Sequence, residues 1–262
     1  MTEEIANPTS AWLAECLDLV EQDAARAHTK AQIRRNETSG ADRVIANHCL
    51  GLASTELGLW QDAQTAFTAA RDETPVDEPR SQSRAGIMAG NAALVGGDAE
   101  GALDLFMTAQ TDARTAASAP LEAASASDAA RALVALNRSD EALTPLDTAT
   151  RLEPNNSEAW LLKATLLRRL DRLDEAQGAI ETAVGLAPLN GAIGLEAGVI
   201  AVLAGREDAA RQSWQSVIDT QPDSLAAQTA KDYLEQIGPA EQDTATQNTS
   251  PQDTTNQDTA TP

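Results

Sequence analysis

The sequence has few aromatic residues, few basic residues and no long apolar segment. Aromatic residues make up 3% of its 262 residues, which disfavours a β-sheet core because sheets are rich in aromatic and β-branched residues. Lys and Arg number 19 against 40 Asp and Glu, so the formal net charge is -21 and no segment forms a basic block. A nucleic-acid backbone therefore has no evident binding site, and neither does an anionic membrane surface. The longest uncharged apolar run, residues 197–204, is far shorter than the roughly 20 residues of a membrane-spanning helix.

Cysteine is almost absent, with Cys16 and Cys49 the two members of this type. Both lie among apolar residues, and we interpret them as buried thiols in a reducing compartment, with a disulfide between them left open. The chain begins with the acids Glu3 and Glu4 and has no continuous apolar core there, unlike a secretory signal. We therefore expect a cytoplasmic protein with no segment inserted in a membrane.

Motifs that carry chemistry are also missing. The two histidines, His28 and His48, have no His-Glu-x-x-His or Cys-x-x-Cys context, so no metal site is predicted. No phosphate-binding Gly-x-x-x-x-Gly-Lys loop and no Gly-x-Ser-x-Gly elbow occurs. The many carboxylates are scattered, and no catalytic pair can be chosen among them. We expect a protein that is not an enzyme and needs no cofactor.

What the sequence does contain is an internal repeat. Pro154, Pro188 and Pro222 are each 34 residues apart, and Pro75 lies 79 residues before Pro154. A fixed spacing of this kind is typical of a solenoid built from one repeated structural unit. Phasing on the prolines gives five units, which are residues 44–77, 83–116, 123–156, 157–190 and 191–224.

Five positions of the unit have a consistent chemical type. Small residues at position 8 and alanine at position 20 let two helices cross closely, and a large apolar residue at position 24 fills the space beside the crossing. Proline at position 32 ends the second helix. The alanines at position 20 are Ala63, Ala102, Ala142, Ala176 and Ala210, and the large residues at position 24 are Phe67, Phe106, Leu146, Ile180 and Trp214. Turn formers occupy position 15, namely Gly58, Gly97, Asn137, Asp171 and Gly205.

These units resemble tetratricopeptide repeats (TPR), whose period is 34 residues. Unit 157–190 resembles the family pattern most, with Trp160, Ala164, Ala176 and Pro188, whereas unit 83–116 is weak and lacks the terminal proline. The resemblance implies an all-α, right-handed superhelical solenoid of stacked helical hairpins. It further implies a non-catalytic scaffold or adaptor that binds another protein.

The two ends of the chain differ from the repeats. Residues 1–43 are expected to form a helical cap or a degenerate repeat, and residues 225–237 a capping helix that covers the last apolar face. Residues 238–262, rich in Gln, Asp and Thr, are predicted to be a disordered acidic tail. Pro145, at position 23 of its unit, predicts a bend in that unit's second helix.

The resemblance also places first-helix positions 2, 5, 9, 12 and 13 on the concave surface. The candidate partner-binding residues among them are Arg84, Ile87, Asn91, Arg131, Leu161, Thr165, Arg168, Arg169, Leu195 and Val199. The arginines suggest an amphipathic or extended acidic peptide, because guanidinium groups pair well with carboxylates. The open alternative is that these arginines only pair with neighbouring acids such as Asp171 and Asp174. Two other functions stay open, a homo-oligomerising module and an accessory or assembly factor for an enzyme or secretion complex.

Overall fold

The computed structural model describes residues 8–238, and within this range it consists of α-helices without strands. The helices are α1 (Pro8–Gln22), α2 (Ala24–Glu37), α3 (Ala41–Glu56), α4 (Trp60–Glu73), α5 (Pro79–Val95), α6 (Ala99–Thr115), α7 (Ala119–Ala135), α8 (Leu143–Leu152), α9 (Ser157–Arg169), α10 (Leu173–Leu186), α11 (Gly191–Leu203), α12 (Glu207–Thr220) and α13 (Leu225–Ile237). The acidic tail predicted for residues 238–262 lies, apart from Gly238, outside the described residues.

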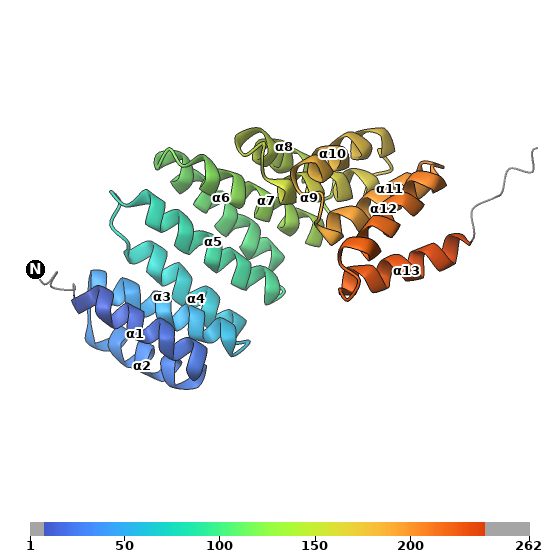
Figure 1. The fold of residues 1–262 in the computed structure, drawn as a ribbon. Coiled ribbons are helices and arrows are strands. Elements are labelled where there is room, and N and C mark those ends of the chain that lie inside the picture. The colour runs from blue at the N-terminus through green and yellow to red at the C-terminus, as the bar shows by residue number, and fades with distance from the viewer. Residues whose placement is uncertain (1–7, 239–262) are drawn as a thin grey trace, which may run out of the picture.

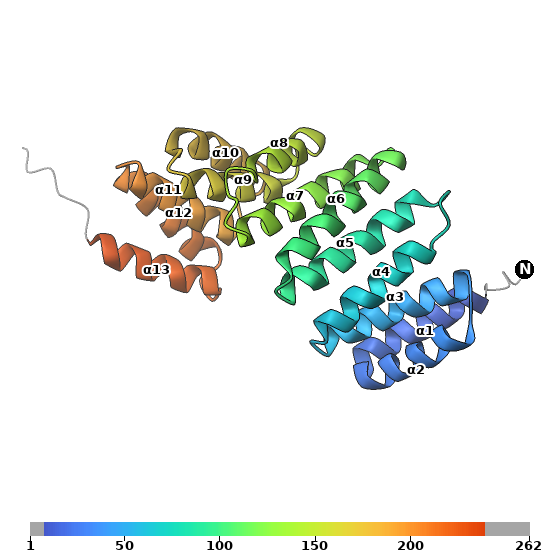
Figure 2. The ribbon, with the colours of Figure 1, turned by 180° about the vertical axis from the view of Figure 1, so that it is seen from behind.

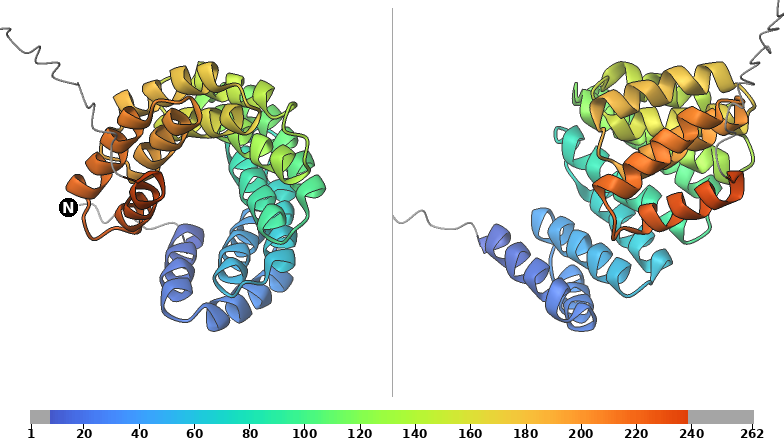
Figure 3. Two further views of the ribbon diagram at one scale, coloured as in Figure 1. Left: turned by 90° about the vertical axis from the view of Figure 1, so that its right-hand side faces the viewer. Right: turned by 45° about the vertical axis from the view of Figure 1, so that its right-hand side comes forward.

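Successive helices pack as antiparallel hairpins that stack side by side from α1 to α13 (Figures 1 and 2). Seen along the stack, the helices trace an open ring (Figure 3, left). The fold is the all-α superhelical solenoid that the periodic prolines predict. The repeat boundaries and the status of residues 1–43 stay predictions, while the helix bounds are those given above.

In the hairpins α3–α4, α5–α6 and α11–α12, a large side chain of the second helix lies on a glycine of the first. An added Cβ at Gly51 would lie 2.5 Å from the Phe67 ring, and one at Gly90 would lie equally close to the Phe106 ring. Phe67 and Phe106 are 2% and 0% exposed. The glycines therefore accept an aromatic ring directly, which is a closer fit than the small-on-small crossing expected between positions 8 and 20.

Replacing Gly90 with alanine should therefore destabilise the protein. Overpacking a filled core costs about 1–3 kcal/mol, which outweighs the roughly 1 kcal/mol that alanine gains over glycine inside a helix. Gly178→Ala is the matched control, because Gly178 is an exposed helical glycine with nothing within 4 Å of the added Cβ. Urea unfolding should show a lower midpoint for Gly90→Ala and a raised one for Gly178→Ala. Equal shifts in both variants would mean that the Phe106 ring does not occupy this space.

The turns inside the hairpins agree with the sequence prediction. All five residues at position 15 have a positive φ, including Asn137 at 60° and Asp171 at 59°. Non-glycine residues rarely adopt this left-handed region, and Asn and Asp tolerate it best. The backbone of each turn therefore explains why position 15 is restricted to Gly, Asn and Asp.

The bend predicted at Pro145 is wrong. Helix α8 begins at Leu143, so Pro145 lies in its first turn rather than inside a longer helix. An amide in the first turn has no helical partner in any case, so proline costs little there. The chain instead forms consecutive turns before α8, with the Glu141 amide donating to the Arg138 carbonyl and the Ala142 amide to that of Ser139. The result is a helix of 10 residues, whereas α4 and α12 have 14.

The two cysteines are joined, so their interpretation as reduced thiols is not what the structure shows. Cys16 of α1 and Cys49 of α3 form a disulfide with a Cα–Cα distance of 6.3 Å. Both are 0% exposed and pack in one cluster with Ala31, Leu50 and Ala66. The bond ties the N-terminal hairpin to the rest of the solenoid. At the other end, α13 covers α12 through the rings of Trp214 and Tyr233, whose centroids lie 5.1 Å apart.

A candidate peptide-binding groove

The odd-numbered helices form the inner layer of the solenoid. Close contacts join α1 to α3, α5 to α7, α9 to α11 and α11 to α13. In a curved stack of hairpins, the helices that approach their next-but-one neighbours are those on the inside of the curve. The open ring of Figure 3 is therefore lined by the first helix of each hairpin. Its inner surface is the candidate groove.

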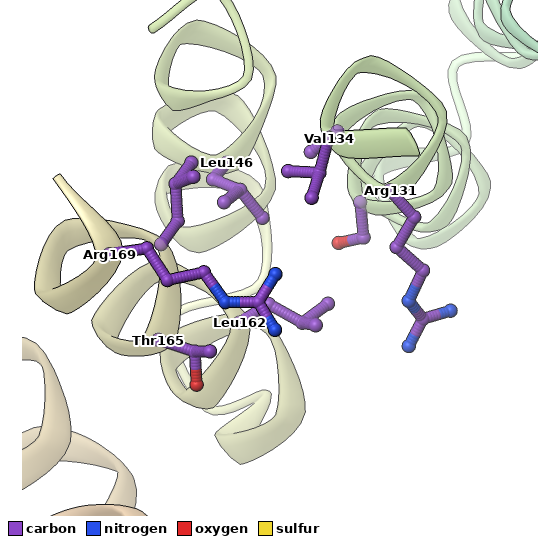
Figure 4. Close-up of a pocket in the computed structure, with 9 residues that line it drawn as sticks. Arg131, Val134, Leu146, Leu162, Thr165 and Arg169 are labelled. Carbon is purple, nitrogen blue, oxygen red and sulfur yellow. The ribbon is translucent and has the colours of Figure 1, made fainter. Parts of the chain in front are cut away.

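A hollow of about 180 Å³ opens on this surface between α7 and α9. Its walls are mainly apolar, and α8 reaches it only through Leu146 (Figure 4). The residues that line it are Ser127, Ala130, Arg131, Val134, Leu146, Leu162, Thr165, Leu166 and Arg169. Three of the ten predicted site residues, Arg131, Thr165 and Arg169, are thus brought together at one place.

Of the predicted site residues Arg131, Arg168 and Arg169, the first two already pair with carboxylates of the protein. Arg131 donates to Asp128 at 2.8 Å and also to Glu158. Arg168 donates to both oxygens of Glu196 on α11, at 2.6 and 3.3 Å. These partner acids lie on the same inner helix or on the next one. They are not Asp171 and Asp174, which the sequence suggested as possible partners. These pairs join successive hairpins and leave little charge for a ligand.

Arg169 differs from both. It is exposed, lines the hollow, and forms no ion pair with any residue of the range 8–238. In Figure 4 its guanidinium group extends across the opening toward Leu162, whereas that of Arg131 points away from the hollow. Arg169 is therefore the cation that remains available beside the apolar walls.

Asp128, one of the two acids that pair with Arg131, is buried. Burial raises the pKa of the Asp128 carboxyl, and the Arg131 guanidinium and a hydrogen bond from the Asn91 amide only partly offset this effect. Asn91 of α5, Asp128 of α7 and Glu158 of α9 are consequently linked through one network.

The remaining predicted residues lie elsewhere along the groove. Arg84 lines a second hollow, of about 310 Å³, together with Leu13, Ile45 and His48. Burial lowers the pKa of that histidine. Ile87 is half-buried on α5 and lines neither hollow.

Three predicted leucine and valine positions contribute to packing. Leu161 lies partly buried against the cluster of Leu167, Ile180 and Ile193. Leu195 and Val199 pack in the same way against the cluster around Trp214. Four lining residues lie outside the concave positions predicted from the sequence: Ala130, Leu146, Leu162 and Leu166. Leu162 is one position beyond the expected row, and Leu146, predicted to fill the hairpin core, also forms the floor of the hollow.

Two kinds of site do not occur in the described part of the chain. No group of three or more His, Cys, Asp or Glu residues is arranged to hold a metal ion there. Within residues 8–238, no helix combines the length and the apolar character needed to cross a bilayer.

The stacked hairpins with an open inner surface define a helical-repeat solenoid. Residues 127–177 and 161–224 match a tetratricopeptide repeat family model. This match shows that residues 127–224 consist of tetratricopeptide repeats, and the described helices before and after them continue the same hairpin geometry.

Solved structures share this fold at low sequence identity. pilF from Pseudomonas aeruginosa is 15% identical with a TM-score of 0.64, and the alignment covers 86% of this chain and 97% of that one. YrrB, a TPR protein with an unusual peptide-binding site, is 23% identical with a TM-score of 0.52 over 79% and 98% of the two chains. MamA from Desulfovibrio magneticus RS-1 is 15% identical with a TM-score of 0.57 over 69% and 97%. A search of curated proteins gave no match.

Proposed function

We propose that this protein is a non-catalytic scaffold that binds an acidic, amphipathic peptide segment of another protein along its concave surface. The observation that carries the proposal is the apolar hollow between α7 and α9 with the unpaired Arg169 at its edge. A bound peptide segment would supply the apolar side chain and the carboxylate that this arrangement lacks. YrrB, which shares the fold, is described as having a peptide-binding site, and this supports the proposal.

The charge of the protein makes this surface selective. A net charge of -21 repels acidic segments in general. Arg84 and Arg169 are exposed cations on the inner helices and form no ion pair among the described residues. An acidic peptide is therefore attracted locally and repelled elsewhere. Salt screens both the attraction and the repulsion, over about 10 Å at 0.1 M, so the preference of an acidic peptide for these arginines over the rest of the surface should fall as the salt concentration rises.

A displayed random-peptide library, selected on the immobilised full-length protein, tests the proposal without assuming a sequence. We expect enriched peptides that compete with one another and lose binding to Arg169→Glu. Arg151→Glu is the matched control, because Arg151 is exposed, unpaired in the described range and lies on the outer helix α8. The proposal would be wrong if no peptide were enriched, or if both variants affected the enriched peptides equally.

A second candidate function, self-association, is favoured by an apolar corner at the C-terminal end. Leu189 is 65% exposed and Leu225 is 78% exposed. Gly191, two residues after Leu189, packs against Ala226, the residue after Leu225. The Gln221 side chain also donates to the Leu189 carbonyl. The two leucines therefore lie at the same corner of the molecule. Light scattering should then show dimers or larger species that Leu189→Ser/Leu225→Ser converts to monomers. A monomer at all concentrations would remove this candidate.

The state of the two cysteines bears on the cellular location. The sequence favours the cytoplasm, where thiols are kept reduced. The Cys16–Cys49 bond instead favours an oxidising compartment, because such bonds persist there. Alkylation of thiols in cells lysed directly into denaturant distinguishes the two, because both cysteines are buried in the folded protein and a cytoplasmic protein would then be labelled at both.

A further inference from the structure

We propose that the hollow between α7 and α9 is a specificity pocket for one large apolar side chain, and that Arg169 binds a carboxylate next to it in the same peptide. The inference rests on the proposed function and names the chemistry of the partner, an anchor such as Phe, Leu or Met close to an Asp or Glu. It is carried by three features of the hollow: its size, its apolar walls and the free charge at its rim.

The size and walls fit a single anchor. The hollow measures about 180 Å³, and an apolar cavity of about 150 Å³ is large enough to bind benzene. Leu146 and Leu166 are 2% and 3% exposed and form a firm floor. Val134 and Leu162 stand on opposite sides, one from α7 and one from α9 (Figure 4). Small residues on α7, Ala130 and Ser127, leave the space that a larger side chain would fill.

The charge at the rim selects an acid. Arg131 and Arg168 are bound to Asp128, Glu158 and Glu196, so neither is free to bind a partner without breaking an existing pair. Arg169 has no such pair and lies beside the apolar walls. When an anchor displaces water from the hollow, the local dielectric falls and an arginine–carboxylate contact strengthens. The anchor and the acid should therefore act together.

The protein's own C-terminal segment is a poor occupant. Residues 239–262 contain acids but no apolar residue larger than alanine or proline. That segment could offer a carboxylate to Arg169 but nothing to fill the hollow. A segment of a different protein, with both groups close together, matches the site better.

Short fluorescent peptides test the pocket directly. One parent peptide contains a single Phe near a single Asp in a Gly/Ser background, and three derivatives carry Phe→Ala, Asp→Asn or Asp→Lys. Fluorescence anisotropy with the full-length protein should show that Phe→Ala and Asp→Asn each weaken binding about tenfold or more. Asp→Lys should weaken it further. Equal affinity of all four peptides would overturn the inference.

Two protein variants separate a specific pocket from a general effect. Arg169→Glu should lose binding of the Asp peptide and regain binding of the Lys peptide, which a merely damaged fold would not do. Ser127→Phe should fill the hollow from its half-exposed edge and abolish the preference for Phe over Ala. Arg151→Glu should change neither preference, and circular dichroism should show that all three variants remain helical.

The inference and the proposed function fail differently. If library-selected peptides bind the concave surface but are indifferent to Ser127→Phe and to the charge at position 169, the pocket assignment is wrong and the scaffold proposal stands. If no peptide binds the protein at all, the scaffold proposal fails, and the pocket assignment fails with it.

Discussion

Phe106→Ala is expected to lower the free energy of unfolding by about 3–5 kcal/mol, the cost of removing a fully buried aromatic ring. Phe106 is 0% exposed and lies on Gly90, so its loss leaves a cavity against a backbone that has no side chain to fill it. The effect should be local as well as large, because each hairpin of a solenoid contacts mainly its neighbours. Urea unfolding followed by circular dichroism should show a lower midpoint and a broader transition.

The adjacent residue provides the control for that measurement. Met107 is 57% exposed on the same helix, and Met107→Ala should change stability by no more than about 0.5 kcal/mol. Comparable losses in the two variants would contradict the packing described for α5 and α6. A small loss in Phe106→Ala would contradict it as well.

Reduction of the Cys16–Cys49 disulfide is expected to destabilise the N-terminal hairpin by about 3–4 kcal/mol, the loop-closure estimate for cysteines 33 residues apart. Among the helices of the range 8–238, α1 packs mainly against α2 and α3, so breaking the bond weakens one of its two main attachments. Hydrogen exchange of the amides in α1 to α3 should become much faster on reduction. The amides of α9 to α12 should be unchanged.

A Cys16→Ala/Cys49→Ala variant separates the effect of losing the disulfide from any other effect of the reducing agent. It should reproduce the exchange of the reduced protein with or without reducing agent. Uniform exchange in oxidised and reduced protein would contradict a structural role for the bond. So would a titration that finds two free thiols in denatured protein that was purified without reductant.

Features that repeat along the chain were accessible from the sequence. The prolines gave the period, and the residues at position 15 marked turns that all have positive φ in the structure. Gly51 with Phe67 and Gly90 with Phe106 likewise recur in register, because the same hairpin crossing recurs. A column of similar residues reveals a shared backbone environment even where no single residue would.

Features that occur once were not accessible in the same way. Arg168 and Arg169 are neighbours in the sequence, yet one is held by Glu196 of α11 and the other faces the hollow. The direction in which each side chain leaves α9, and its distance to the next hairpin, decide which arginine is paired. Neither quantity can be read from the sequence. The pairing of Cys16 with Cys49 likewise depends on how α1 docks on α3. The short α8 arises from Pro145 in one unit alone.

Site-specific photo-cross-linking tests the central claim most directly. A photoreactive amino acid at Thr165, which lines the hollow on α9, should capture a library-selected peptide, and the cross-link should be lost in Arg169→Glu. The same photoreactive group at Arg151, on the outer helix α8, should capture none. Capture at position 151, or equal capture at both positions, would contradict binding on the concave surface.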